Sequence, residues 1–250
     1  MEVLTLKKQR NFGNIEKTRA GCKDVWNAYM CADASFDRGN WDIPLCPTTA
    51  QEIPNEIITW EEAKSIYKKM LARGEKEFKH NAFVCFYLDD YKFDGTRGVW
   101  HNSVGCLKIL RHFAGAITPD FSTYQDFPAA IKIYNTYRMR VFGYWLGKNG
   151  IKVINNIRWG SEETFGYCFS GIPMNSMIAI GTVGGSPRKR IDRERFEKGL
   201  EELVRVLKPH TILVYGSANY PCFEKLREQG IAIVSYQSKT AAYFDRRRLV

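Results

Sequence analysis

The sequence predicts an α/β protein whose mostly parallel sheet has about six strands joined by crossover helices, either as an open sheet or as an incomplete TIM-like barrel. Two observations predict this fold. From about residue 81 onward, short β-branched or aromatic runs alternate with longer segments of helical period. Prolines and glycines stand where those helical segments should begin and end. Repeated strand–helix units of this kind place neighbouring strands parallel to one another.

Six short apolar runs are the predicted strands of this sheet. They are Phe83–Leu88, Gly115–Thr118, Ile151–Asn155, Met177–Thr182, Thr211–Tyr215 and Ile231–Ser235. The clearest helix lies before Pro209, where apolar residues recur at helical spacing from Phe196 to Leu207 and Asp192 is the expected cap. The other predicted helices of this part of the chain are Ser103–His112, Asp126–Asn149 followed by Gly150, and Pro221–Gln229 followed by Gly230.

Residues 1–80 differ from this pattern and are predicted to form an N-terminal extension that packs on a core domain of residues 81–250. Thr59 and Glu62 form a capping-box pattern that starts a helix reaching about Arg73. Three tryptophans are expected to anchor the extension, because large aromatic side chains usually serve cores. They are Trp26, Trp41 and Trp60.

Composition describes an ordinary globular chain of 250 residues with 44% hydrophobic residues. Its longest apolar runs fall well short of the ~20 residues that cross a bilayer, and the first residues show no secretory leader. We therefore expect a cytoplasmic protein with no membrane contact. Lysine and arginine outnumber acidic residues 37 to 27, which favours a phosphate-rich partner, nucleic acid or nucleotide, although the same excess also serves solubility.

Metal and cofactor motifs are absent from the sequence. The seven cysteines include no CxxC pair, and the four histidines form neither an HxH pair nor an HExxH motif. Cysteines inside apolar runs are expected to be small buried hydrophobic residues. Cys22, Cys31 and Cys46 leave a weaker metal alternative. We predict no metal site, and the sequence identifies no cofactor.

Polar residues after the predicted strands form the candidate site, because ligands of parallel α/β proteins bind at the carboxyl ends of strands. Asp120 follows the second predicted strand, where a carboxylate serves as nucleophile, general base or acceptor for a sugar hydroxyl. The alternative is that Asp120 caps a turn with Ser122. Asp89 and Asp90 follow the first strand and form a second acidic group, and paired carboxylates suit glycosidic bond chemistry or Mg²⁺. Solvation at the surface is the alternative for at least one of the two. The predicted catalytic residues are Asp120, Asp89 and Ser122.

A second group of residues is predicted to bind substrate or phosphate. The loop from Thr182 to Arg190 combines small residues with a basic cluster, although it lacks the P-loop and GxGxxG patterns. Arg138 and Arg140 lie two apart on a helix, so only one of them is expected to face the site. The predicted binding residues are Tyr124, Arg138, Asn156, Arg158, Thr182, Gly184, Gly185 and Arg188.

Several motifs resemble an uncharacterised family carried by phages, prophages and plasmids. They include Phe86-Tyr87-Leu88-Asp89-Asp90, Thr118-Pro119-Asp120-Phe121-Ser122, Cys168-Phe169-Ser170-Gly171 and Gly181-Thr182-Val183-Gly184, within residues 81–239. The resemblance implies a mobile-element setting and a site around Asp120, but no reaction. The layout, not the motifs, is also similar to base-exchanging transglycosylases, whose barrels use an aspartate after a strand; this is an analogy of fold.

Three functional hypotheses follow from these features. The first is an enzyme that acts on nucleic acid or a nucleotide and breaks or exchanges an N-glycosidic bond with Asp120. The second is a non-catalytic nucleic-acid-binding protein in replication or host takeover, whose binding depends on its positive charge. The third is an inhibitor of a host protein, in which case the partner is a protein.

Overall fold

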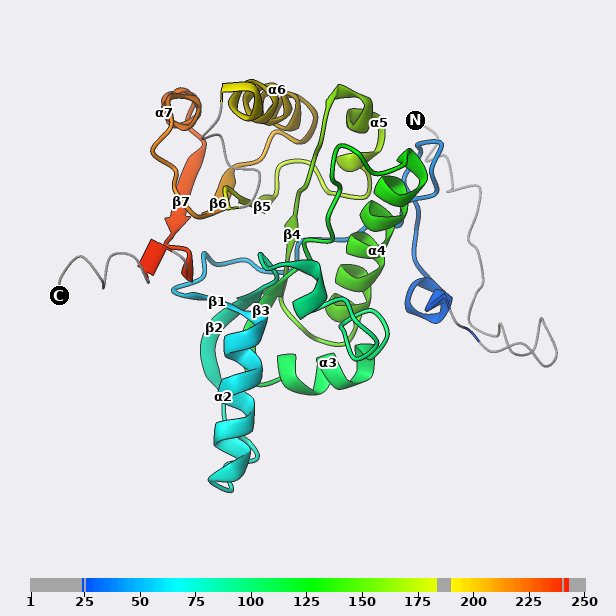
Figure 1. Cartoon of the computed structure of the whole chain (residues 1–250), viewed down its shortest axis with the longest axis vertical. Coiled ribbons are helices and arrows are strands. Elements are labelled where there is room, and N and C mark those ends of the chain that lie inside the picture. The colour runs from blue at the N-terminus through cyan, green and yellow to red at the C-terminus, as the bar shows by residue number, and fades with distance from the viewer. Residues whose placement is uncertain (1–23, 25, 184–189, 240, 243–250) are drawn as a thin grey trace.

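The computed structural model describes residue 24 and residues 26–183, 190–239 and 241–242. Its single sheet has seven strands, which are all parallel and follow one another in chain order from β1 to β7. The sheet curls into an open half-barrel, and the helices lie around its outer, convex side (Figure 1). The predicted parallel α/β fold is confirmed, with one strand more than the six predicted.

The strands are β1 (Ile57–Thr59), β2 (His80–Cys85), β3 (Phe113–Ile117), β4 (Val153–Asn156), β5 (Met177–Gly181), β6 (Thr211–Tyr215) and β7 (Ala232–Tyr236). The α-helices are α2 (Trp60–Ala72), α3 (Ser103–Leu110), α4 (Ala129–Lys148), α5 (Phe165–Cys168), α6 (Arg190–Leu207) and α7 (Pro221–Glu228). Short 3₁₀ segments are η1 (Ala28–Cys31), η2 (Asp90–Lys92) and η3 (Glu162–Thr164).

The strand order explains the curl of the sheet. Each crossover contains at least one α-helix. Each strand pairs with the strand before it in the chain, so the sheet grows in one direction from β1 to β7. Crossovers that always advance in one direction keep the helices on one side of a parallel sheet and bend it toward a barrel. Within the described residues β1 pairs with β2 and β7 with β6, so these two strands are the open edges.

β1 is the strand that the sequence analysis missed. It has three residues, Ile57–Thr59, and pairs with β2 from within the predicted extension. A run this short gives no periodic signal, and the capping box begins at once, with Thr59 both ending the strand and capping α2. The division into an extension of residues 1–80 and a core of residues 81–250 stays a prediction.

The helix ends follow the local signals closely. The predicted capping box is present, because the Thr59 hydroxyl accepts from the Glu62 N–H and the Glu62 carboxylate accepts from the Thr59 N–H. Gly150 follows α4 with φ at +81°, a conformation that favours glycine. The expected cap at Asp192 was wrong, because α6 begins at Arg190 and Asp192 lies within its first turn.

Alternating side chains divide the strands between an inner and an outer core. Cys85, Ile154 and Leu213 face inward and belong to one buried cluster, which Ala50 joins from the segment before β1. The outward residues belong to two larger clusters between the sheet and the helices. The interior of the half-barrel is therefore apolar at mid-height, and polar groups enter it at the carboxyl edge. In the described parts of the chain, no helix is long and apolar enough to span a membrane.

Candidate functional site

Asp120 lies at the carboxyl edge of the sheet, after β3. Two side chains bond its carboxylate, one from the last residue of β4 and one from the loop that follows β4. Asn156 donates its side-chain amide to Asp120 Oδ1 at 2.9 Å, and Arg158 Nη1 lies 3.3 Å from Asp120 Oδ2. Asp120 is 8% exposed. The structure thus brings together three predicted site residues, and both contacts of Asp120 come from the neighbouring strand rather than from the turn partner Ser122.

Tyr87 completes this group from β2. It lies two residues after Cys85, as Asn156 lies two residues after Ile154, so strand alternation points both side chains into the half-barrel. The Tyr87 hydroxyl donates to Asn156 Oδ1 at 3.0 Å, which leaves the amide nitrogen to face Asp120. Burial, followed by the nearby Asp120 charge, raises the pKa of Tyr87 well above its usual value. Tyr87 therefore stays a hydrogen-bond donor.

Replacing Tyr87 with phenylalanine is expected to lower the free energy of unfolding by about 1–2 kcal/mol, because the buried Asn156 Oδ1 loses its donor. Urea unfolding of the two proteins measures the difference. Tyr215→Phe is the matched control, since Tyr215 stacks on Tyr87 with ring centroids 5.1 Å apart and its hydroxyl accepts from the Lys239 N–H instead of bonding to Asn156. An equal loss of stability in both variants would show that the bond from Tyr87 to Asn156 contributes no more than the bond between Lys239 and Tyr215.

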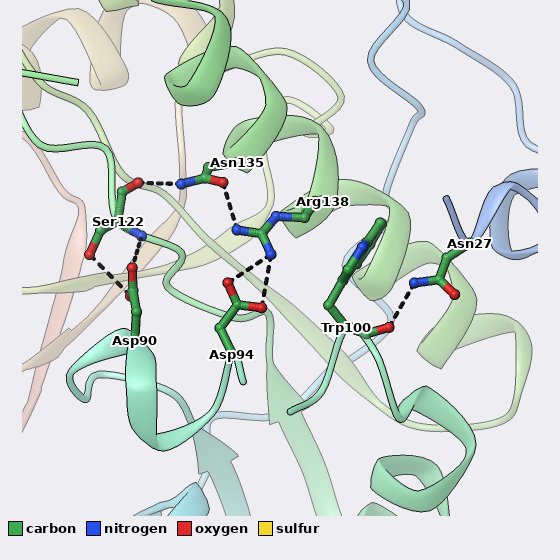
Figure 2. A network of polar contacts seen from close by, with 7 residues as sticks. All are labelled: Asn27, Asp90, Asp94, Trp100, Ser122, Asn135 and Arg138. Carbon is green, nitrogen blue, oxygen red and sulfur yellow. Dashed lines mark hydrogen bonds and ion pairs between the residues drawn. The ribbon is translucent and has the colours of Figure 1, made fainter. Parts of the chain in front are cut away.

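A second polar network lies beside the first and uses Ser122 (Figure 2). The Ser122 hydroxyl donates to Asp90 Oδ1 at 3.0 Å, and its backbone N–H donates to Asp90 Oδ2 at 3.3 Å. Asn135 on α4 donates its amide to the Ser122 carbonyl. Ser122 is therefore engaged in fixing the loop after β3 to the loop after β2 and to α4, and the nearby carboxylate is Asp90 rather than Asp89.

Arg138 lies in this second network and not at Asp120. Its Nη1 atom donates to both carboxylate oxygens of Asp94, at 2.8 and 2.7 Å, and its Nη2 atom donates to Asn135 Oδ1 at 2.7 Å (Figure 2). The guanidinium also covers the Phe121 ring at 3.9 Å. These contacts make Arg138 a buried link between α4 and the loops. Both of its Nη atoms are already bonded within this network, so nothing in these contacts supports the predicted phosphate contact of Arg138.

Asp90 gives this network a pH dependence. Burial raises the pKa of the Asp90 carboxyl, against the opposing effect of its bonds from Ser122. A raised folded-state pKa means that the fold favours the protonated carboxyl, so this stabilising contribution is complete below the unfolded-state pKa and is lost as pH rises through the folded-state pKa.

Asp90→Asn removes that charge and keeps an acceptor and a donor for Ser122. The melting temperature of this variant is expected to equal or exceed that of the wild type at pH 7. The gain in free energy of unfolding should stay below about 1 kcal/mol, because Asp90 is partly solvated. The gain should shrink as pH falls through the Asp90 pKa. Melting curves of both proteins between pH 3 and 8 measure it, and a gain that grows on acidification would contradict the prediction.

The other predicted residues either have other contacts than Asp120 or lie outside the described residues. Asp89 is exposed and pairs with Lys92 at 3.0 Å. Thr182 is buried and donates its hydroxyl to the Ser217 carbonyl at 3.0 Å, which ties the loop after β5 to the loop after β6. Tyr124 is 53% exposed. Gly184, Gly185 and Arg188 lie outside the described residues.

A hollow of about 250 Å³ opens beside Asp120. We call it the Arg158 hollow, and it is lined by residues 123–125 after β3, residues 157–161 after β4, Gly181 at the end of β5, and Asp192, Arg195 and Phe196 of α6. Asp120 itself is not part of the lining. Arg158 is the link, because it bonds Asp120 and also forms part of the wall.

Arg140 is the buried residue that the sequence analysis did not recognise as part of the site. It is 0% exposed, and its guanidinium donates to three backbone carbonyls, those of Asn156, Cys168 and Ser170. Burial lowers the pKa of Arg140 to about 10, so the side chain stays charged at neutral pH. The only sequence signal was its place two residues after Arg138, which predicts different directions but no partner.

The described cysteines are mostly buried and far from forming a group of metal ligands with other His, Cys, Asp or Glu side chains. Cys31 and Cys46 are buried in the outer hydrophobic cluster that includes α4, and Cys22 lies outside the described residues. Burial raises the pKa of the Cys46 thiol to about 12, which disfavours the thiolate that a metal would need. Among the described residues, no group of three or more His, Cys, Asp and Glu side chains is placed to hold a metal ion.

Comparison with known proteins gives one family and two phage relatives. The family described as "Domain of unknown function (DUF4417)" matches residues 36–237. The "Gene 1 protein" of Mycobacterium phage L5 is 32% identical over 232 residues, which cover 92% of this chain and 90% of the phage protein. The "Gene 1 protein" of Mycobacterium phage D29 is also 32% identical over 232 residues, which cover 92% of this chain and 77% of the phage protein. No solved structure matches the chain.

Proposed function

We propose that this chain, which belongs to the DUF4417 family, is an enzyme that acts on a nucleotide or on nucleic acid and breaks or exchanges an N-glycosidic bond with Asp120. The observation that carries the proposal is the Asp120 carboxylate, held from two directions by Asn156 and Arg158 beside the Arg158 hollow. Fixed polar groups next to a concave space at the strand ends are typical of active sites in parallel α/β proteins.

A carboxylate would be a poor choice for a site that only binds phosphate. Asp120 offsets the charge of Arg158 and therefore weakens the attraction of that arginine for an anion. This weaker attraction for an anion is explained if the Asp120 carboxylate itself reacts, or if it orients Arg158. Within the described residues each Asp120 oxygen accepts one side-chain bond, and a carboxylate oxygen has room for a second contact. Asp120 thus keeps a lone pair for a substrate.

The proposed reaction uses that lone pair as a nucleophile. One Asp120 oxygen attacks C1′ of the sugar, the C1′–N bond breaks, and the base leaves with the electron pair of that bond. The product is a sugar ester of Asp120. Water then attacks C1′, the ester bond from C1′ to the Asp120 oxygen breaks, and the proton that water loses goes to the departed base. In an exchange reaction a second base attacks C1′ in place of water, and its N–H proton goes to the first base. Asn156 and Arg158 orient the carboxylate throughout, and Tyr87 fixes the Asn156 amide. Because nucleotides are present in the cytoplasm, we propose that the protein acts in that compartment.

The direct test is a screen for released base. The full chain is incubated with single-stranded DNA, duplex DNA, RNA and nucleoside monophosphates, and free bases are measured by liquid chromatography and mass spectrometry. The expected result is release or exchange of base from one class. The peptide that contains Asp120 should gain the mass of the substrate without its base, which is a sugar phosphate for a nucleoside monophosphate and the strand minus one base for DNA or RNA. No base release or exchange from any class would reject the proposed reaction.

A non-catalytic nucleic-acid-binding protein is the second candidate, and the distribution of charge favours it. Residues 1–23 and 243–250 contain nine lysines and arginines against three acidic residues, so they hold six of the ten net positive charges. These residues lie outside the described part of the structure. Binding of this kind uses phosphate contacts that release counterions, so the affinity falls steeply with salt.

The second candidate is tested by affinity for DNA and RNA at several salt concentrations. Replacing Arg246, Arg247 and Arg248 with alanine is expected to weaken binding and to make its salt dependence shallower. Affinity that does not change with salt would reject this candidate. Salt-dependent binding without any base release would support it over the enzyme.

A further inference from the structure

An unpaired hydroxyl lies in the wall of the Arg158 hollow. Thr123 is 6% exposed and forms part of the lining, and its Oγ1 atom has no hydrogen-bond partner among the described residues. Such buried unpaired groups are uncommon, and a missing external partner is one established reason for them. A change of χ1 rotamer moves a threonine hydroxyl to another of three staggered positions, so the Thr123 hydroxyl can change direction without a shift of the backbone.

The charges around the hollow favour an anion. Arg158 and Arg195 both line it, and among the described residues of the lining Asp192 is the one acidic side chain. Arg158 bonds Asp120 at one nitrogen, whereas Arg195 is exposed and has no ion pair within the described ranges. Two guanidinium groups and a hydroxyl around a small space are suited to the oxygens of a phosphate group.

The aromatic lining adds a surface for the rest of the ligand. Tyr124 is half-exposed and lines the hollow together with Trp159 and Phe196. The Trp159 and Phe196 rings are in contact, with centroids 5.3 Å apart. Bases stack readily on such rings. A volume of about 250 Å³ is below that of a typical pocket for a drug-sized ligand, so it accepts only a fragment of a nucleic acid.

We infer that the Arg158 hollow is the phosphate subsite of the proposed enzyme, in which Thr123, Arg158 and Arg195 bind the phosphate group next to the sugar that Asp120 attacks. This inference rests on the proposed function for its substrate class. The phosphate contacts themselves do not require Asp120 chemistry, because Asp120 lies behind Arg158 and not in the lining. Binding and turnover are therefore separable by experiment.

The test titrates the full chain with inorganic phosphate at constant ionic strength and follows binding by phosphorus NMR. Thr123→Val is expected to weaken phosphate binding about tenfold, because one hydrogen bond to a charged group is lost. The melting temperature of this variant should stay the same or rise, since the hydroxyl has no partner to lose. Thr123→Ser keeps a hydroxyl and should bind like the wild type.

Charge variants give the second readout. Arg195→Gln should weaken phosphate binding, and Asp192→Asn should strengthen it, because the two side chains line the same hollow with opposite charge. Acetate is the competing probe. Binding of acetate as tight as that of phosphate would overturn the phosphate assignment in favour of a carboxylate site.

The remaining outcomes separate this inference from the proposed function. Equal phosphate binding by the wild type and by Thr123→Val and Arg195→Gln would place phosphate elsewhere and overturn the inference, as would no binding at all. Asp120→Asn should bind phosphate at least as tightly as the wild type, because the charge that offsets Arg158 is removed, while base release is lost. Phosphate binding that depends on Thr123, in a protein that releases no base from any substrate, would support the subsite and reject the proposed reaction.

Discussion

Asparagine in place of Asp120 is expected to abolish base release, with a loss of at least about a thousandfold in rate. The side chains have nearly the same shape, so Asn156 keeps an acceptor, but the amide is not a nucleophile. One end of the new amide carries hydrogens and cannot accept from Arg158, which now lies 3.3 Å from the carboxylate. We expect the folded state to lose about 1–2 kcal/mol as a result. Rates from the base-release assay and urea unfolding measure the two effects.

Asp89→Asn is the matched control for Asp120→Asn. Asp89 also follows a strand, but its side chain is exposed and pairs with Lys92. This variant should keep the rate and the stability of the wild type, because surface ion pairs contribute little. Full activity in folded Asp120→Asn would remove the carboxylate from the mechanism. Loss of activity in Asp89→Asn, with full activity in Asp120→Asn, would indicate that Asp89 and not Asp120 is the reacting carboxylate.

Methionine in place of Arg140 is expected to lower the free energy of unfolding by about 3–5 kcal/mol. Methionine fills much of the same space, but it leaves the carbonyls of Asn156, Cys168 and Ser170 without their donor. Each buried carbonyl that loses its partner costs about 1–3 kcal/mol. Relief from burying the charge offsets part of that cost. The shift in the urea midpoint at unchanged slope measures the net effect.

Arg205→Met is the control for Arg140→Met. Arg205 is exposed on α6 and pairs with Glu202, so its replacement should change stability by no more than about 0.5 kcal/mol. Arg140→Lys should be intermediate, since one ammonium group cannot reach three separate carbonyls with the geometry of a guanidinium. Stability of Arg140→Met within about 1 kcal/mol of the wild type would mean that the three carbonyls find other donors.

The tertiary structure changes the interpretation of two neighbouring pairs of residues. Asp89 and Asp90 were both candidates and Asp89 was the predicted catalytic residue, yet Asp90 accepts the bonds of Ser122 whereas Asp89 is exposed. The sequence analysis also chose Arg138 over Arg140. Arg138 clamps Asp94, and Arg140 supports the backbone of Asn156 at the site. Residues one or two apart share the same local signals, so sequence pattern does not tell which of them meets a buried partner.

The sequence by itself determined the parallel α/β fold, most element boundaries and the place of Asp120 at a strand end, because strand and helix periods and capping residues act over a few neighbouring positions. Only the tertiary structure decided that Tyr87, Asp120, Asn156 and Arg158 meet. These residues lie at the ends of three strands, β2, β3 and β4, or shortly after them, and the curl of the sheet sets their distances. That curl depends on the packing of all the crossover helices together, which no single segment encodes.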